Sequence, residues 1–165
     1  MDRPQFANPL TALVDAAAQR LLTADAVAAW KFNTGGVVVD PRREQEVIDA
    51  VTTYAVARSI DPDYVKGVFR DQIDATRALE HGRIAQWRLD PASVPACVPE
   101  LSACRAEIDV LNRTMVDEIA LRWDSLRSPA CAPDLENAKR VVIGARRLDG
   151  PSQQALAYAT QKYCR

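Results

Sequence analysis

The sequence predicts an all-α protein: a single domain over residues 1–165, built as a bundle of about six helices around a long central helix. Glycine is rare, with 6 residues in 165, and no segment alternates apolar and polar residues like a strand for more than a few positions. Apolar residues instead recur at three- and four-residue steps, as in helices with one buried face. A chain of this length can bury a substantial core.

The long central helix is predicted from Asp61 to Trp87. Asp61 is followed by Pro62, which pairs a helix N-cap with a proline in the first turn. Its apolar face begins with Val65, Val68, Phe69 and Ile73 and continues through Thr76, Leu79, Glu80 and Arg83. A hydroxyl and the carboxyl of Glu80 therefore occupy positions where aliphatic groups are expected. An interior carboxylate needs a partner or a ligand, whereas at the edge of the stripe Glu80 would simply be solvated.

A first helix is predicted over residues 9–33. Its apolar stripe consists of Leu10, Leu13, Val14, Ala17, Leu21, Ala24, Val27 and Ala28. Arg20 and Lys31 fall on or beside this stripe, and eleven residues correspond to about three helical turns. Both cations therefore point toward whatever the stripe buries. The alternative is that they are solvated charges at the edge of the stripe, with only their aliphatic stems covered.

The second helix is predicted over about residues 41–59. Gly35 and Gly36 interrupt the first helix, and Asp40-Pro41 repeats the signal of a cap followed by proline. Arg43 lies in the first turn, where a cation opposes the helix dipole. This placement is tolerable on a surface, but it also suits a site that needs cations.

Residues 89–99 are predicted to form a proline-rich, non-helical connection. A fourth helix is predicted over about residues 101–127, and two shorter helices over about residues 134–148 and 151–163. The apolar stripe of the fourth helix consists of Ile108, Leu111, Met115, Ile119 and Trp123. One turn before this stripe lie Cys104 and Arg105.

The four cysteines favour an oxidising compartment and a disulfide-stapled fold. Three pairings are possible, and none of the cysteines forms the close CxxC pair of a zinc site. We expect Cys97–Cys104, which brackets a short loop containing proline, and Cys131–Cys164, which ties the last helices together. The alternative is four reduced, buried thiols in a cytosolic protein.

Several classes of partner are not indicated. The formal net charge is −1, so no basic field points to nucleic acid. No apolar run approaches the ~18 residues of a membrane span, so we expect no membrane partner. The N-terminal residues MDRPQF do not resemble a signal peptide, and we expect that Met1 stands in place of a removed leader.

The common catalytic motifs are also absent from the sequence. It contains no Gly-rich phosphate loop, no nucleophile elbow and no HExxH. His81 is the only imidazole, and we expect it on the surface beside Glu80. What the sequence does offer are the side chains expected to face inward from the helices, namely cations, one hydroxyl and one carboxyl.

This constellation resembles the active-site pattern of the helical chorismate mutases. The matching residues are Arg20, Lys31, Asp40-x-x-Arg43 and Thr76-x-x-x-Glu80. The likeness is greatest to the secreted subgroup and extends over almost the whole chain. It includes, in order, the segments LVDAAAQRL, ADAVAAWK, IDPDYVKGVFRDQIDAT, LDPAS, LSACRAEID and ATQKYC, together with the pair Cys131/Cys164.

The resemblance implies an isomerase that converts chorismate to prephenate in one pericyclic step, without metal or cofactor. It further implies a secreted or periplasmic homodimer in which each pocket belongs to one chain. The runner-up interpretation is an exported, disulfide-stapled helical binding protein of the same fold that lacks catalysis. Intact inward charges disfavour that reading, because a binding protein has no need to keep them.

In terms of this family, each matching residue has an expected role. Arg20 and Arg105 would bind carboxylates, Thr76 would support the ring carboxylate, and Arg43 would face the other carboxylate or the ring hydroxyl. Lys31 and Glu80 would meet the ether oxygen. Secreted relatives have a glutamine one turn after the second-helix arginine. Here the ungapped match is Val47, a shift of one residue offers Glu46, and Glu44 is a further candidate for the ring hydroxyl.

Overall fold

The structure, a computed structural model, describes residues 8–96 and 99–164. Its helices are α1 (Thr11–Thr34), α2 (Pro41–Ala57), α3 (Pro62–Leu89), the 3-10 helix η2 (Pro91–Ser93), α4 (Leu101–Leu121), α5 (Trp123–Leu126), α6 (Cys131–Arg146) and α7 (Gly150–Thr160). These two described ranges contain no strand, so the predicted all-α fold is confirmed. None of the described helices combines the length and the apolar character needed to cross a membrane.

Local chemistry explains where the helices begin and end. The Asp40 carboxylate accepts a hydrogen bond from the backbone N–H of Arg43 at the start of α2, and Asp61 accepts one from Asp63 at the start of α3. Gly35 ends α1 in the left-handed conformation, with φ of 69°, which glycine adopts without steric cost. Ser59 is also left-handed, so α2 ends at Ala57 rather than at the predicted residue 59.

Two predicted segments differ from the structure. The predicted helix over residues 101–127 is divided into α4 and α5, because the backbone at Arg122 departs from helical geometry, with φ of −107° and ψ of 19°. The connection predicted to be non-helical contains the single turn η2. There Ser93 donates to the Asp90 carboxylate over 2.6 Å, and its backbone N–H donates to the Asp90 carbonyl. Proline fits this turn because it lies at the first position, where no N–H is needed.

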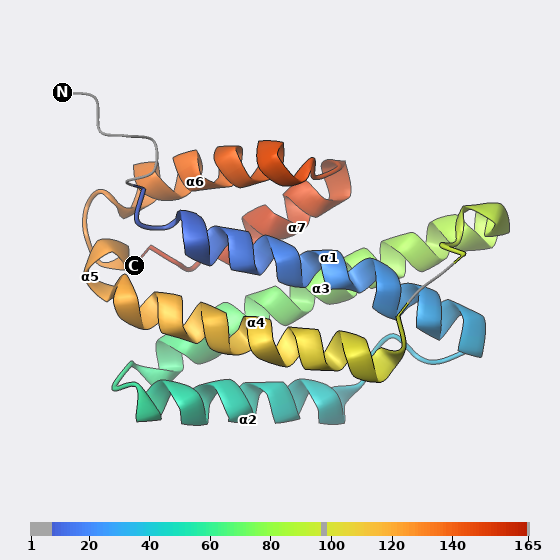
Figure 1. Ribbon diagram of the computed structural model, residues 1–165, viewed down its shortest axis with the longest axis horizontal. Coiled ribbons are helices and arrows are strands. Elements are labelled where there is room, and N and C mark those ends of the chain that lie inside the picture. The colour runs from blue at the N-terminus through green and yellow to red at the C-terminus, as the bar shows by residue number, and fades with distance from the viewer. Residues whose placement is uncertain (1–7, 97–98, 165) are drawn as a thin grey trace.

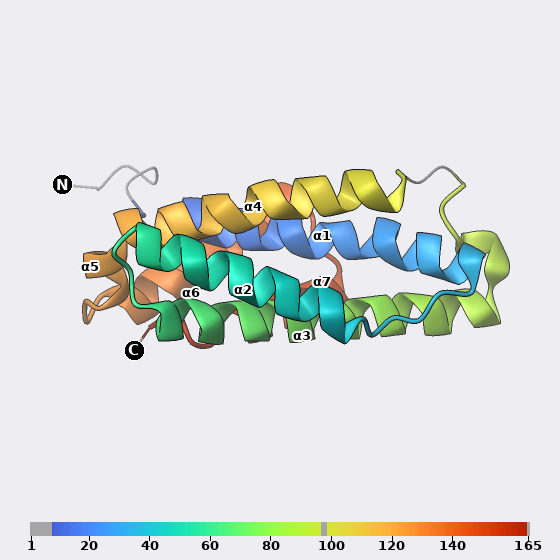
Figure 2. The same ribbon diagram turned by 90° about the horizontal axis from the view of Figure 1, so that it is seen from below.

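The helices α1 and α3 lie at the centre of the bundle. α1 packs against α3, α4, α6 and α7, while α3 also packs against α2 and α7. α2 and α4 contact each other, so α1, α2, α3 and α4 enclose a common space and run lengthwise through the molecule (Figure 1 and Figure 2). The short helices α6 and α7 cover another side of the central pair (Figure 1).

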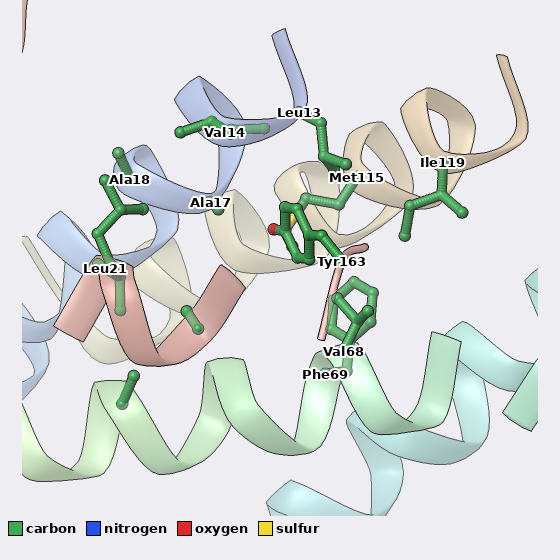
Figure 3. Close-up of a cluster of buried hydrophobic side chains, with 14 of the residues drawn as sticks. Leu13, Val14, Ala17, Ala18, Leu21, Val68, Phe69, Met115, Ile119 and Tyr163 are labelled. Carbon is green, nitrogen blue, oxygen red and sulfur yellow. The ribbon is translucent and has the colours of Figure 1, made fainter. Parts of the chain in front are cut away.

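The main hydrophobic core joins α1, α3 and α4 to the end of the chain. All eight residues of the predicted α1 stripe are buried. Figure 3 shows Tyr163, near the C-terminus, pointing into the cluster between Met115 of α4 and Phe69 of α3. All three of these residues are 0% exposed, so Tyr163 forms part of the core although it lies near the C-terminus.

One of the two predicted disulfides lies within the described residues. Cys131 and Cys164 are joined, across a sequence separation of 33, so that prediction is confirmed. Cys104 is buried and has no disulfide partner within the ranges 8–96 and 99–164. Its predicted partner, Cys97, lies outside the described residues, so the pairing Cys97–Cys104 stays a prediction.

Candidate active site

A cavity of about 100 Å³ lies between α1, α2, α3 and α4. Its lining comprises Arg20, Thr23, Val27, Lys31, Val38, Asp40, Arg43, Glu44, Val47, Ile73, Thr76, Arg77, Glu80, Leu101, Arg105 and Ile108. The six side chains that the sequence singles out for a substrate are all in this set, although they come from four different helices. The structure thus brings the candidate residues together, while their roles toward a substrate stay predictions.

Lys31 and Glu80 form an ion pair across the cavity wall between α1 and α3. The Lys31 ammonium lies 2.9 Å from Oε1 of Glu80 and also donates to the Val38 carbonyl over 2.8 Å. Their side chains are only 11% and 8% exposed. Burial raises the pKa of Glu80, and the positive charge of Lys31 opposes this rise. The carboxyl predicted to face inward is therefore buried and has a cationic partner.

Arg20 is the most deeply buried cation of the cavity, at 3% exposure. Its Nε donates to Oδ1 of Asn112 over 2.7 Å, and its Nη1 donates to Oγ1 of Thr76 over 3.4 Å. Both acceptors are neutral. Burial, followed by the charge of Arg43, lowers the pKa of Arg20 to about 10, so the side chain remains cationic at neutral pH. A buried positive charge thus faces the cavity without a carboxylate in contact among the described residues.

Arg43 and Arg105 are less buried and are paired with carboxylates. Arg43 Nη2 donates to Oδ1 of Asp109 over 3.0 Å, and Arg105 Nη2 donates to Oδ2 of Asp40 over 3.3 Å. The other carboxylate oxygen of Asp40 caps α2 at the backbone of Arg43. Asp40 therefore fixes the start of α2 and the Arg105 side chain of α4 at the same time.

The three candidates for the position near the ring hydroxyl differ in location. Glu44 and Val47 line the cavity, whereas Glu46 does not and instead forms an exposed pair with Arg42. Glu44 accepts a short hydrogen bond from Arg77, whose Nε is buried without a partner among the described residues. Glu44 is thus the one of the three that brings a hydrogen-bonding group to the cavity.

Three residues that organise the site, Arg77, Asp109 and Asn112, are not among the residues predicted from the sequence. A signal for two of them was available on α4. Arg105, Asp109 and Asn112 are spaced by four and then three residues, so they share one helix face. The amide of Asn112 lies beside the apolar stripe, where a polar side chain needs a partner.

The cavity lining is electropositive. Five cations line it, namely Arg20, Lys31, Arg43, Arg77 and Arg105, against the three carboxylates Asp40, Glu44 and Glu80. Hydrogen-bond donors surround a partly enclosed space, where electrostatic interactions are stronger than in bulk water. Such an arrangement can hold a small polyanion in one conformation and stabilise negative charge that develops on it.

Comparison with known proteins identifies the family. The family model for chorismate mutase type II matches residues 11–81, which carry five of the six candidate residues. The secreted chorismate mutase of Mycolicibacterium smegmatis is 59% identical over 159 residues, covering 96% of this chain and 88% of the relative. The chain belongs to the chorismate mutase family.

Two further relatives of this chorismate mutase-family chain agree with that assignment. The secreted chorismate mutase of Mycobacterium tuberculosis is 44% identical over 162 residues, covering 98% of this chain and 81% of the relative. The crystal structure of chorismate mutase from Burkholderia phymatum superposes with a TM-score of 0.90 at 26% identity, covering 96% of this chain and 97% of that one. Arg105 lies beyond the family-model match but within the span of these longer comparisons.

Proposed function

We propose that the chain converts chorismate to prephenate in the cavity between α1, α2, α3 and α4. The observation that carries this proposal is the charge of Arg20, which is buried beside the cavity and contacts only neutral acceptors. Burying a cation without a counter-charge destabilises the fold. A dianionic substrate such as chorismate supplies that counter-charge when it binds.

The reaction needs restraint more than covalent chemistry. In one concerted step the ether C–O bond breaks and a new C–C bond forms, so no nucleophile is required. The enzyme must hold the flexible dianion in its reactive conformation, and fixed cations can do this. In our proposal Arg20 and Arg105 bind carboxylates, Thr76 supports the ring carboxylate, and Arg43 faces the second carboxylate.

Lys31 and Glu80 are proposed to stabilise the ether oxygen. An ammonium has three N–H donors, and Lys31 directs two of them to Glu80 and Val38. The third donor is available for the oxygen that gains negative charge as the C–O bond breaks. Glu80 can donate a second hydrogen bond only in its protonated form, which its burial favours.

We propose Glu44 for the ring hydroxyl. Val47 also lines the cavity but has no hydrogen-bonding group, and Glu46 lies outside the lining. The carboxylate of Glu44 is held by Arg77, which fixes its direction and leaves its remaining lone pairs for a hydroxyl donor.

The setting is proposed to be extracytoplasmic. Two relatives are named secreted chorismate mutases, and the Cys131–Cys164 disulfide fits an oxidising compartment, either the periplasm or the exterior.

We further propose a homodimer whose two cavities work independently. One chain supplies every charged group in our scheme, so no residue from a partner is needed.

Incubation with chorismate tests the function directly. The expected result is the loss of chorismate absorbance with formation of prephenate in equal amount, without added metal or cofactor. A helical binding protein of the same fold would instead bind chorismate, as seen by calorimetry, and return it unchanged.

A further inference from the structure

We propose that Asn112 is the positioning residue for Arg20, and that its neutral amide keeps the charge of Arg20 free for the anionic substrate. This inference rests on the proposed function of the cavity. It concerns a residue that lies outside the cavity lining and does not touch the space where chorismate would bind.

The pairing pattern of the five cations sets Arg20 apart. Lys31 is paired with Glu80, Arg43 with Asp109, Arg77 with Glu44, and Arg105 with Asp40. Among the described residues, Arg20 is the one cavity cation that contacts no carboxylate. It is also the most buried of the five, so the missing counter-charge is most costly there.

The geometry shows how Asn112 orients the guanidinium. Its Oδ1 accepts from Nε over 2.7 Å, and both residues are buried, at 5% exposure for Asn112 and 3% for Arg20. A guanidinium has five N–H donors, of which Nε carries one. Fixing Nε from α4 leaves the Nη1 and Nη2 end, which reaches Thr76 on the cavity wall, for a carboxylate.

Asparagine and aspartate have nearly the same shape, so the two side chains would differ at position 112 mainly in charge. An aspartate at this position would accept the same hydrogen bond and would also neutralise Arg20. Such a pair would lower the cost of burying Arg20, but it would place a negative charge behind the group that must attract a dianion. Burial, followed by the charge of Arg43, lowers the pKa of Arg20, and the carboxylates of Asp109 and Glu80 oppose this only from a distance, without contact.

The test compares Asn112→Asp with Asn137→Asp, which makes the same chemical change at an exposed position on α6. We expect Asn112→Asp to raise KM for chorismate by about tenfold or more with kcat little changed, because binding to both ground and transition state is weakened. The midpoint of thermal unfolding should not fall. Asn137→Asp should leave KM, kcat and the unfolding midpoint unchanged.

A KM for Asn112→Asp within about twofold of the wild-type value would overturn the proposal. If that variant does not fold, Asn112→Ser shortens the side chain, which moves the acceptor away from Nε of Arg20 without adding charge. A drop in kcat/KM of about fivefold or more in folded Asn112→Ser supports positioning, and an unchanged kcat/KM overturns it. Arg20→Ala distinguishes a failure of the role of Asn112 from a failure of the proposed function of the cavity. If Arg20→Ala is inactive while the Asn112 variants behave like wild type, only the present inference fails; full activity of Arg20→Ala would remove the proposed function of the cavity as well.

Discussion

The Lys31 ammonium lies 2.9 Å from the Glu80 carboxylate in a wall of the cavity where both side chains are nearly enclosed. Two opposing effects therefore act on one carboxyl group. Burial raises the pKa of Glu80 and favours its neutral form, while Lys31 favours the charged form. The protonation state decides whether Glu80 donates a hydrogen bond to the ether oxygen or serves to hold Lys31 in place.

The pH dependence of Glu80 variants distinguishes these roles. A neutral carboxylic acid is present below its pKa and is lost as pH rises through it, so kcat/KM should fall on the alkaline side. Glu80→Gln keeps a donor of similar shape at every pH and should remove that alkaline fall. Glu80→Ala should be poor throughout. The measurement is the pH profile of kcat/KM for the three proteins.

A different pattern of activities would show that Glu80 only holds Lys31 in place. If Glu80→Gln is as inactive as Glu80→Ala, and the wild-type profile shows no glutamate-like titration, direct donation by Glu80 has to be abandoned. The carboxylate would then act by fixing Lys31.

Arg105 is predicted to be essential within its own chain. Arg105→Ala should lower kcat/KM by about 100-fold or more and raise KM, because it removes a charge-assisted contact to a carboxylate. The control is a mixture of Arg20→Ala and Arg105→Ala proteins. If each cavity belongs to one chain, mixing restores no activity; recovery on mixing would show that a partner supplies the arginine.

The Cys131–Cys164 disulfide is predicted to affect stability more than activity. It closes a loop with a sequence separation of 33, which in the loop-entropy account stabilises the fold by about 3–4 kcal/mol. Neither cysteine lines the cavity. Cys131→Ser should therefore lower the midpoint of thermal unfolding clearly and leave kcat/KM at room temperature nearly unchanged. A loss of activity in protein that is still folded would contradict this.

The predicted pair Cys97–Cys104 is tested by counting thiols. If both disulfides are formed, denatured but unreduced protein should contain essentially no free thiol. Two reactive thiols per chain would show that Cys97 and Cys104 are reduced. The assay requires no variant and no substrate.

The sequence predicts most of the fold because its signals are local. Asp40-Pro41 and Asp61-Pro62 mark the starts of α2 and α3, and both aspartates cap as expected. The inward direction of Glu80 also follows from local spacing, since it lies on the same helix face as Phe69 and Ile73. Helical periodicity is sufficient for such statements.

Partners across helices could not be predicted in the same way. Arg83 lies on the extended α3 stripe, yet it pairs with Asp25 of α1 and with Asp149, just before α7. The contact of Arg20 with Asn112 joins residues 92 positions apart. Such pairs depend on how the helices are shifted and rotated against one another, which hydrophobic spacing alone does not determine.

In our proposal the cavity keeps a buried cation for a dianionic substrate, and Arg20→Met removes that cation. Methionine has a similar volume and no charge. The substitution therefore removes a costly buried cation, but it also leaves the side-chain oxygen of Asn112 without its hydrogen-bond donor. We predict a midpoint of thermal unfolding within about 5 °C of wild type. In the same protein kcat/KM for chorismate should fall by about 100-fold or more. A folded Arg20→Met protein whose kcat/KM stays within about threefold of wild type would contradict the account.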